Sequence, residues 1–419
     1  MTDVDVAIVG AGAAGIAACR ALLEAGLTVQ VMEARDRIGG RAHTDHGLGL
    51  PADMGAAWLH FAEDNAFTTI ARDAGFTVIQ REPNWGPDAF VGIRSPTPKE
   101  RERAAADWDR YQGLIDAAAD AGRDVAVGDL LPMDDFRRRF DAVMTWAVGV
   151  ESTAVSTLDL ARYAESTHNW AVAEGLGSVV ARSASRLPIT LRAPVTAIRW
   201  DDQSVQLDTP AGTVRARAAI VTVPTAVLAA GSIAFVPKLP ACSIAALDAL
   251  PLGVVNKVFF RVDDAVLPFA DTTQLIGTDD SSRTGSYTVR PAGQPVIAGF
   301  FGGDLSWELE QRGELDGFAR DELQRIFGVE LVRGIRATLT TGWGSDPWAR
   351  GSYSAARPGQ ADQRAALADP VAPTLSFAGE ACSRTFYGTL HGAWLSGREA
   401  AARLIAHFDK LGYVARSQT

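Results

Sequence analysis

The sequence predicts two interleaved domains, one of the α/β class and one of the α+β class. The chain opens with an apolar strand, a glycine-rich turn, a helix and a second strand, which is the order of a βαβ unit. Strand patterns of the same apolar kind return late in the chain, at 219–223 and 374–377. With 419 residues, 47% of them hydrophobic, the chain exceeds the size at which a single core stops growing. We therefore expect a first domain from 1–78, 174–240 and 355–419, and a second from 79–173 and 241–354.

Apolar periodicity and turn residues predict the elements of the first half. Val4 to Val9 is a short run rich in valine and isoleucine, as strands are, and the glycines after it must form a turn. Helical patterns follow at 98–122 and 134–148, rich in Ala and Arg, and these would cap a pocket. In order, the expected elements are strand 4–9, turn 10–15, helix 16–25, strand 28–32, helix 63–74, a Pro- and Trp-containing domain crossing at 81–87, and helices 98–122 and 134–148.

The second half alternates between strand and helix patterns. Pro210-Ala211-Gly212 is a turn signal between two alternating runs, which indicates a hairpin. Leu390 to His407 repeats apolar residues at helical spacing and predicts a long closing helix. In order, the expected elements are helix 174–185, strands 195–200, 205–207, 219–223, 254–262 and 295–301, helix 315–327, strand 374–377 and helix 390–407.

Net charge and cysteine usage exclude several classes of partner. The formal net charge is −10 and no basic cluster interrupts it, so we expect no nucleic-acid partner; a cationic substrate suits this balance. Cys19, Cys242 and Cys382 are odd in number, widely spaced and without a C-x-x-C pair, which predicts neither a disulfide framework nor a metal site. The N-terminus lacks a basic leader and no run approaches ~18 apolar residues. We expect a cytoplasmic protein without membrane contact, either a monomer or a homodimer.

The glycine turn predicts a Rossmann-like dinucleotide site. Gly10-Ala11-Gly12-Ala13-Ala14-Gly15 fits G-x-G-x-x-G, and it lies directly after a strand and opens a helix, as the mechanism of phosphate binding requires. Glu33 ends the second strand, where a carboxylate accepts both ribose hydroxyls and repels a 2′-phosphate. Gly39-Gly40-Arg41 adds a second glycine pair and a cation for the same diphosphate. This extra clamp favours a permanently held FAD over an exchanging NAD.

Further motifs extend over nearly the whole chain. They are Asp53-Met54-Gly55-Ala56-Ala57-Trp58-Leu59-His60, Val255-Asn256-Lys257-Val258, Trp343 to Tyr353, Phe377-Ala378-Gly379-Glu380 and His391 to Arg398. With the glycine turn and in this order, they resemble the flavin-containing amine oxidase family, in its polyamine oxidase branch. They also resemble the catalytic core of the flavin-dependent lysine demethylases, but those enzymes carry extra domains for which this chain has no room.

The resemblance implies a Rossmann-like FAD-binding domain interleaved with a substrate-binding domain of mixed sheet and helices. Ser352 stands where monoamine oxidases carry the cysteine that bonds the flavin, so non-covalent FAD is implied. Glu380 would hold a ribityl hydroxyl, and the amides at the start of the helix from Leu390 would face the flavin N1 and O2 region. The implied cofactor-binding residues are Gly10, Gly12, Ala14, Gly15, Glu33, Ala34, Arg35, Gly40, Arg41, Gly55, Ala56, Trp58, Val195, Trp343, Gly379, Glu380, Thr389 and Leu390.

Five residues are implied in the chemistry: Lys257, His60, Tyr353, Trp343 and Thr389. Lys257 lies in an apolar run where an unpaired ammonium is costly, and in the family it bridges through water to flavin N5. Trp343 and Tyr353 would shape the substrate cavity. Thr389 replaces the second tyrosine of monoamine oxidases, and His60 would accept a hydrogen bond from the substrate nitrogen. No residue is assigned to a metal.

The implied reaction is oxidation of an amine, with a polyamine or another long aliphatic amine as substrate. Hydride passes from the carbon next to the amine nitrogen to flavin N5, the imine is hydrolysed to aldehyde and amine, and O2 reoxidises the flavin and yields hydrogen peroxide. Carboxylates for a distal ammonium could be Glu82, Glu151, Asp159 or Glu165.

Three other functions stay open from the sequence. An L-amino acid oxidase would need an arginine for the substrate carboxylate, and the candidates are Arg81, Arg162 and Arg290. A flavoprotein desaturase or dehydrogenase acting on a C–C bond has less need of Lys257 and His60. A catalytically silent flavin-binding protein would have no need of Lys257, Trp343 and Tyr353, all of which are present.

Overall fold

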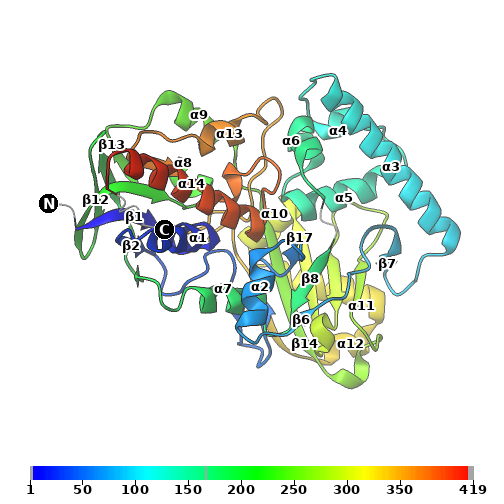
Figure 1. The fold of residues 1–419 in the computed structure, drawn as a ribbon. Helices are drawn as coiled ribbons and strands as arrows, with labels where there is room; N and C mark the ends of the chain where they lie inside the picture. Colours follow the sequence, from blue (N-terminus) through cyan, green and yellow to red (C-terminus); the bar gives the residue numbers. More distant parts are fainter. Residues whose placement is uncertain (1–2, 166–167, 414–419) are drawn as a thin grey trace.

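Two large sheets occupy separate halves of the molecule (Figure 1). The computed structural model describes residues 3–165 and 168–413. Its sheets and helices confirm the predicted mixture of α/β and α+β parts. The helices are α1 (Ala13–Glu24), α2 (Ala66–Asp73), α3 (Pro98–Asp120), α4 (Val127–Leu130), α5 (Arg137–Val148), α6 (Thr157–Arg162), α7 (Leu176–Ser183), α8 (Thr225–Ala229), α9 (Ala241–Ala249), α10 (Gly303–Arg312), α11 (Leu315–Phe327), α12 (Val329–Arg333), α13 (Gln363–Ala368) and α14 (Leu390–Lys410).

The first sheet is assembled from three distant parts of the chain. Its order is β13 (Ala234–Val236), β10 (Ala197–Trp200), β11 (Val205–Thr209), β12 (Gly212–Val221), β1 (Val4–Val9), β2 (Val29–Met32) and β9 (Ile189–Thr190), with β19 (Leu375–Phe377) paired to β12. Strand β12 is antiparallel to β11 over its first half, whereas its second half runs parallel to β1 and β19. The predicted strand 219–223 is therefore the end of a longer strand that begins at Gly212, directly after the predicted hairpin turn.

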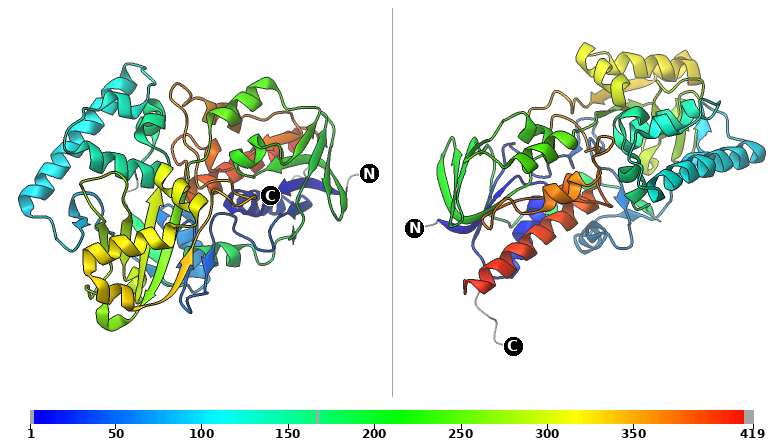
Figure 2. Two further views of the ribbon diagram at one scale, coloured as in Figure 1. Left: turned by 180° about the vertical axis from the view of Figure 1, so that it is seen from behind. Right: turned by 90° about the horizontal axis from the view of Figure 1, so that it is seen from above.

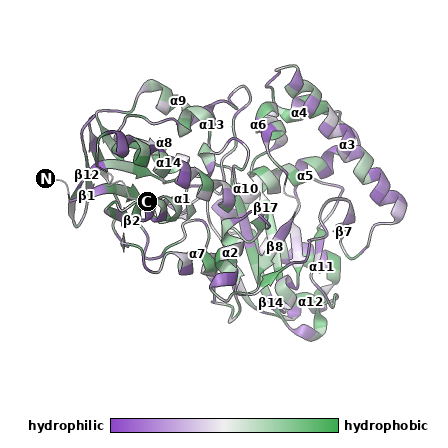
Figure 3. Cartoon of the chain, viewed as in Figure 1, coloured by the Kyte–Doolittle hydropathy of each residue, from purple (hydrophilic) through white to green (hydrophobic). Residues whose placement is uncertain are grey.

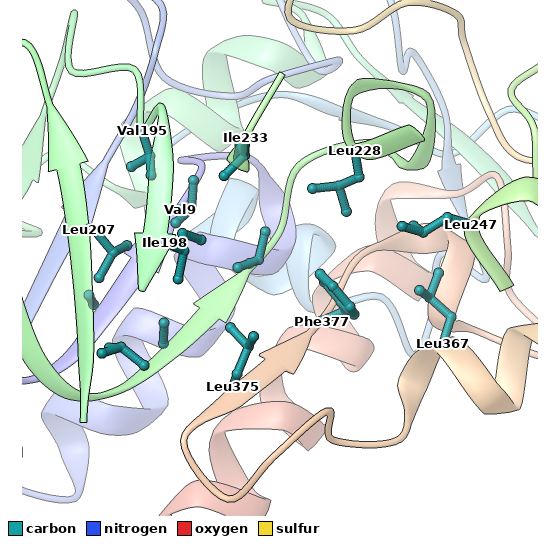
Figure 4. Close-up of a cluster of buried hydrophobic side chains, with 14 of the residues drawn as sticks. Val9, Val195, Ile198, Leu207, Leu228, Ile233, Leu247, Leu367, Leu375 and Phe377 are labelled. Atoms are coloured by element: carbon teal, nitrogen blue, oxygen red, sulfur yellow. The ribbon is translucent and has the colours of Figure 1, made fainter. Parts of the chain in front are cut away.

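Side chains of β1 alternate between two buried layers, because successive residues of a strand point to opposite faces. Val6 and Ile8 pack with helices α1 and α14, while Ala7 and Val9 pack on the other face. That second layer includes Leu247 of α9, Leu367 of α13 and strand residues such as Phe377 (Figure 4). Both faces of β1 are thus apolar and buried, and the glycine turn follows directly at its end.

Helix α1 begins three residues earlier than the predicted helix 16–25. Gly12 is its N-cap and the helix starts at Ala13, because small alanines favour helix and leave the turn unobstructed. It lies along α14, so the first and last helices of the chain are neighbours in all views (Figure 2). A Cβ on Gly397 of α14 would stand 2.1 Å from the Ala14 carbonyl oxygen, and only glycine allows this close approach.

The second sheet carries helices on one face and a cavity on the other. Its order is β18 (Ile335–Thr340), β14 (Val255–Val262), β17 (Val296–Gly302), β16 (Ser286–Val289), β15 (Thr273–Ile276) and β7 (Phe90–Val91). On β14, Val258 and Phe260 pack in the apolar layer under α10, α11 and α12. Lys257 and Phe259, which alternate with them, line the cavity.

Helices α3 to α6 form a separate group beside the second sheet (Figure 1). Thr97 and Glu100 make a capping box at the start of α3, and Pro98 occupies its first turn. Tyr111 and Ile115 bury one face of α3, and the opposite side carries hydrophilic residues (Figure 3). No helix within residues 3–165 and 168–413 has the length and apolar character needed to cross a membrane.

Two small sheets complete the fold. Strand β3 (Thr44–Asp45) pairs with β4 (Ala52–Asp53). Strand β8 (Asn169–Val172) lies between β5 (Leu59–His60) and β6 (Val78–Ile79) and pairs antiparallel with both. The pairing of β6 with β8 lies at the expected domain boundaries at 78 and 173. Backbone hydrogen bonds therefore join the two crossings of the chain from one half to the other.

Candidate active site

A single large cavity brings the predicted site residues together. Its volume is about 1310 Å³, and residues from both large sheets and from α3 and α5 line it. The structure places every predicted catalytic and cofactor-binding residue on its wall except Gly15. Gly15 lies inside α1, where a Cβ would stand 2.0 Å from the Gly10 carbonyl oxygen. That glycine therefore permits the close packing of helix on turn, rather than contact with a ligand.

The glycine turn leaves backbone open to the cavity. Gly10 has φ +102°, a conformation that favours glycine, and a Cβ there would also meet the Thr222 hydroxyl at 2.7 Å. A Cβ on Gly12 would meet nothing within 4 Å, so this part of the turn borders open space at the start of α1. Gly40, with φ +59°, packs against the Cα of Gly12. The first helix thus presents its N-terminal amides to the cavity, an arrangement that attracts an anion.

Charged residues beside the turn are held by fixed partners. Glu33 is 6% exposed and accepts hydrogen bonds from the amides of Ala11 at 2.7 Å and Arg35 at 2.9 Å. The Arg35 side chain makes a bidentate pair with Asp346, at 2.8 and 2.9 Å. Arg35 therefore joins the turn to the segment after β18, and its guanidinium is less available to a ligand than the sequence implied.

Arg41 is positioned from the opposite wall. One of its terminal nitrogens, Nη1, donates to the Ser352 carbonyl oxygen and to Glu380 Oε1, the latter at 3.1 Å. The guanidinium has further donors in a fixed planar fork, and a quarter of the side chain is exposed. Arg41 can therefore meet an anion in the cavity while it remains anchored to the protein.

Glu380 is a structural centre rather than a free acceptor. It accepts four hydrogen bonds, from Arg41, from the amide and hydroxyl of Ser354, and from the Gly388 amide at 2.9 Å. These use the four lone-pair directions of a carboxylate. Burial raises the pKa of Glu380, but Arg41 and Arg364 together with the hydrogen bonds from Ser354 and Gly388 lower it below its usual value. Glu380 therefore holds the loops around the cavity, and its expected contact with a ribityl hydroxyl stays a prediction.

A buried arginine that the sequence did not single out supports this centre. Arg364 has no exposed surface, and its guanidinium pairs with Asp159 through two bonds of 2.6 and 2.8 Å. It also donates to the hydroxyl and carbonyl of Ser354 and stacks 3.7 Å from the centre of the Tyr387 ring. No sequence signal marks Arg364, because its partner lies about 200 residues away.

Lys257 faces the cavity from β14 and binds the opposite loop. Its ammonium donates to the carbonyl oxygens of Asp53 at 2.8 Å and Gly55 at 2.6 Å. Burial lowers the pKa of Lys257 to about 8, although the Asp53 carboxylate opposes the shift. Two of the three ammonium donors are thus used, and the third is left to face the cavity.

Asp53 is the charged residue that acts on Lys257, and in the sequence it was only part of a motif. Its carboxylate accepts from the Thr44 hydroxyl at 2.6 Å and from the amides of Leu176 and Gly177 at the start of α7. A carboxylate at a helix N-terminus is favourable, although burial raises the pKa of Asp53. This anchoring fixes the two carbonyls that hold Lys257.

Asn256, next to Lys257, positions the aromatic wall. It is fully buried, and its Oδ1 accepts from the Trp343 amide and the Thr341 hydroxyl, both at 2.9 Å. Its Nδ2 donates to Glu310 at 2.6 Å, and Glu310 also accepts from the Gly344 amide. The Trp343 indole in turn donates to the Met54 carbonyl at 3.1 Å. The sequence signal that could have identified Asn256 is a polar residue within the apolar run of β14.

His60 is placed as a neutral acceptor. Pairing of β5 with β8 sets it opposite Asn169, and its Nδ1 lies 2.6 Å from Asn169 Oδ1. Because an amide oxygen only accepts, Nδ1 carries the proton and Nε2 is the acceptor nitrogen. Burial lowers the pKa of His60, with only partial opposition from the Asn169 bond. The side chain can therefore accept a hydrogen bond from an ammonium at neutral pH.

Tyr353 and Thr389 both line the cavity, and the hydroxyl of each is bound by the protein. Tyr353 lines the cavity, with its hydroxyl donating to the Trp146 carbonyl oxygen, so the ring is fixed as a wall. The Thr389 hydroxyl donates to the Phe386 carbonyl at 2.7 Å and accepts from the Gly392 amide at 2.8 Å. This is the N-cap of α14. Thr389 is thus a capping residue that also lines the cavity, and its expected part in the chemistry stays a prediction.

The four carboxylates that were candidates for binding a distal ammonium differ in their position and partners. Asp159 is paired with Arg364, Glu151 binds the Asp304 amide at the start of α10, and neither residue lines the cavity. Glu82 and Glu165 line the cavity but are exposed.

The candidate carboxylate-binding arginines are similarly occupied. Arg162 pairs with Asp362 at 2.8 Å, and Arg290 pairs with Asp264 at 2.5 Å. Arg81 lines the cavity, with more than half of its side chain exposed and a loose pair to Asp271 at 3.7 Å. A buried arginine for a substrate carboxylate is therefore not among these three.

Comparison with known proteins identifies the family. The family model described as flavin containing amine oxidoreductase matches residues 13–112 and 120–405. The chain belongs to this family. Among curated members, the chain is 30% identical over 449 residues to probable polyamine oxidase 4 of Arabidopsis thaliana, covering 97% of this chain and 88% of that protein. It is 28% identical to lysine-specific histone demethylase 1 homolog 1 of Oryza sativa subsp. japonica, covering 96% of this chain and 52% of that protein.

Solved structures of the same fold are similar over almost the whole chain. Cyclohexylamine oxidase from Brevibacterium oxydans IH-35A superposes with a TM-score of 0.81 at 24% identity, over 97% of this chain and 100% of that one. Wild-type putrescine oxidase bound to putrescine gives a TM-score of 0.80 at 22% identity, over 96% of this chain and 99% of that one. These two solved structures thus share the fold of this chain.

Proposed function

We propose that this protein is an FAD-dependent amine oxidase acting on a polyamine or another long aliphatic amine. The observation that carries the proposal is the continuity of one cavity, from the glycine turn at Gly10 to Lys257 and His60. A volume of about 1310 Å³ exceeds the roughly 300–1,000 Å³ of an ordinary ligand pocket, as a cofactor with a substrate beside it requires.

The residues beside the first sheet fit FAD. The open backbone at Gly12 accommodates a diphosphate, Arg41 supplies a cation, and Glu33 has lone pairs left for ribose hydroxyls. We propose that the segments 1–78, 174–240 and 355–419 hold this cofactor and that 79–173 and 241–354 hold the substrate. Ser352 exchanges hydrogen bonds with the Val255 amide and carbonyl, and a serine does not bond a flavin, which supports a non-covalent cofactor.

When bound, the flavin accepts hydride from the carbon next to the amine nitrogen and passes the electrons to O2, which yields hydrogen peroxide. The residues of the chain place the substrate. His60 Nε2 accepts a hydrogen bond from the amine, while Trp343 and Tyr353 confine its carbon chain. Lys257 retains a donor for a water near the reacting carbon, and hydrolysis of the imine gives aldehyde and amine.

The test is anaerobic mixing of the purified yellow protein with a panel of amines, followed by measurement of peroxide in air. Bleaching of the flavin by aliphatic amines, with peroxide released in equal amount, is the expected result. Bleaching only by L-amino acids would identify an amino acid oxidase, and no bleaching by any amine would refute the proposal. Acid precipitation should release the flavin into the supernatant, since a covalent flavin would stay in the pellet.

A further inference from the structure

The carboxylates on the cavity wall form two groups, one engaged by donors of the protein and one exposed to solvent, so neither offers a free buried carboxylate to a second substrate ammonium. The described residues supply seven of them, and the ten residues outside the described ranges contain no Asp or Glu. The inner group is Glu33, Asp53 and Glu380. Each is engaged by donors of the protein itself: two amides for Glu33, a hydroxyl and two amides for Asp53, and four donors for Glu380.

The outer group is exposed to solvent. It consists of Glu82, Asp88, Asp109 and Glu165. The Glu82 and Asp88 side chains are 45% and 65% exposed, and each already faces a donor, the Asn169 amide at 3.0 Å and Arg101 at 3.7 Å respectively. Exposed ion pairs contribute only ~0–1 kcal/mol, so this group can attract a cation to the rim but binds it weakly.

Aromatic and positively charged side chains also line the cavity. Trp108, Trp146 and Phe300 line it, together with Lys257 and the half-buried Arg139. Arg139 donates to the Gly86 carbonyl at 2.6 Å, and Asp279, which is not on the cavity wall, favours its charge without forming an ion pair. A second ammonium buried in the cavity would lose its hydration, meet no free buried carboxylate and share the cavity with these two cations.

We propose that the substrate is an amine with one positive charge and an apolar body, and that the cavity discriminates against a diamine whose second ammonium stays inside. This inference rests on the proposed function and, of its two substrate classes, favours the long aliphatic amine with a single charge over the polyamine. Discrimination against a diamine should decrease as its carbon chain lengthens, because a long diamine places its far ammonium at the exposed carboxylates of the rim.

The test compares pentylamine, cadaverine and N-acetylcadaverine, which share one chain length and differ at the far end. We expect kcat/KM for pentylamine and N-acetylcadaverine to exceed that for cadaverine by about 10- to 100-fold. A buried ammonium without a counterion is unfavourable, and access to solvent at the rim reduces this effect. Longer diamines should approach the monoamine of equal length. Equal or faster oxidation of cadaverine would overturn the inference and leave the proposed function standing, and N-acetylcadaverine as slow as cadaverine would show that charge is not the cause. No turnover with any amine would refute the proposed function instead.

A carboxylate placed inside the cavity provides a second measurement. Val143 is half-buried on α5 and lines the cavity, so Val143→Asp supplies the missing counterion, while Val143→Asn is the neutral control of similar shape. Val143→Asp should raise the ratio of cadaverine to pentylamine kcat/KM at least about tenfold over Val143→Asn. Equal ratios in the two variants would count against the inference. The comparison of substrates on the unaltered protein stands if either variant fails to fold.

Discussion

Replacing Asn256 by Asp changes one NH2 group to an oxygen and should make stability depend on pH. The amide Nδ2 donates to Glu310 at 2.6 Å, so Asn256→Asp sets two carboxyl groups against each other in a fully buried site. Repulsion and burial both raise the pKa of the new carboxyl above its unfolded value of ~3.9. At low pH the new carboxyl is protonated, and its proton restores the hydrogen bond to Glu310. The unfolded state binds this proton as well, so the substitution then costs little stability.

The size of the effect follows from the bond that is lost. A hydrogen bond to a carboxylate contributes about 1.5–3 kcal/mol, and removal of one partner of a buried charged pair costs about 3–5 kcal/mol. Stability of the variant is retained below ~pH 4 and declines as pH rises through the raised folded pKa. At pH 8 we therefore expect the free energy of unfolding to be ~3–5 kcal/mol below that of the unaltered protein, with most of the difference gone in mild acid.

Urea unfolding at pH 5 and pH 8 measures this difference, with the exposed Gln203→Glu as a control that should show none. Activity should follow stability, because Asn256 also holds the amide of Trp343. A loss of stability that is equal at both pH values would refute the reasoning, since it would mean that no proton is shared between residues 256 and 310.

Three further changes test other parts of the site. Lys257→Met should lower kcat/KM for amines by about 100-fold or more, whereas the exposed Lys410→Met should not, and unchanged kinetics would remove Lys257 from the chemistry. The lowered pKa of His60 means that the folded state binds fewer protons than the unfolded state below ~pH 6.5, so stability falls as pH falls. Thermal unfolding of His60→Gln should therefore be less sensitive to acid than that of the unaltered protein, and an identical acid profile would contradict a neutral His60. Arg364→Met leaves Asp159 buried and unpaired, which should cost about 3–5 kcal/mol in a urea titration; a loss under ~1 kcal/mol would mean that the pair is dispensable.

Local patterns in the sequence predicted most of the elements, and motifs predicted which of them meet. The strand, turn and helix at the N-terminus were correct in order because apolar alternation and glycine act over a few residues. Lys257 could be singled out because a cation within an apolar strand needs a buried partner or a function. The start of α1 was wrong by three residues, since alanine within a glycine motif belongs to turn and helix equally well.

Roles that depend on distant partners could not be predicted. Thr389 is a different case, because its partners Phe386 and Gly392 lie only three residues away and its capping role depends on where α14 begins. Glu380 looks like a free acceptor until its four donors are known. Asp159 and Arg364 lie far apart in sequence, and a buried pair of this kind leaves no local pattern. Side-chain hydrogen bonds across the cavity, rather than secondary structure, were the missing information.

The position of β19 and α14 in the first sheet also determines when that sheet can form during synthesis. Strand β1 leaves the ribosome first, but part of the neighbouring β12 stays unpaired until residues 375–377 are made. The apolar face of α1 remains uncovered until α14 follows. Contacts over such long separations form slowly and leave apolar surface exposed in the meantime. The nascent chain should therefore need chaperone protection until its final helix has emerged.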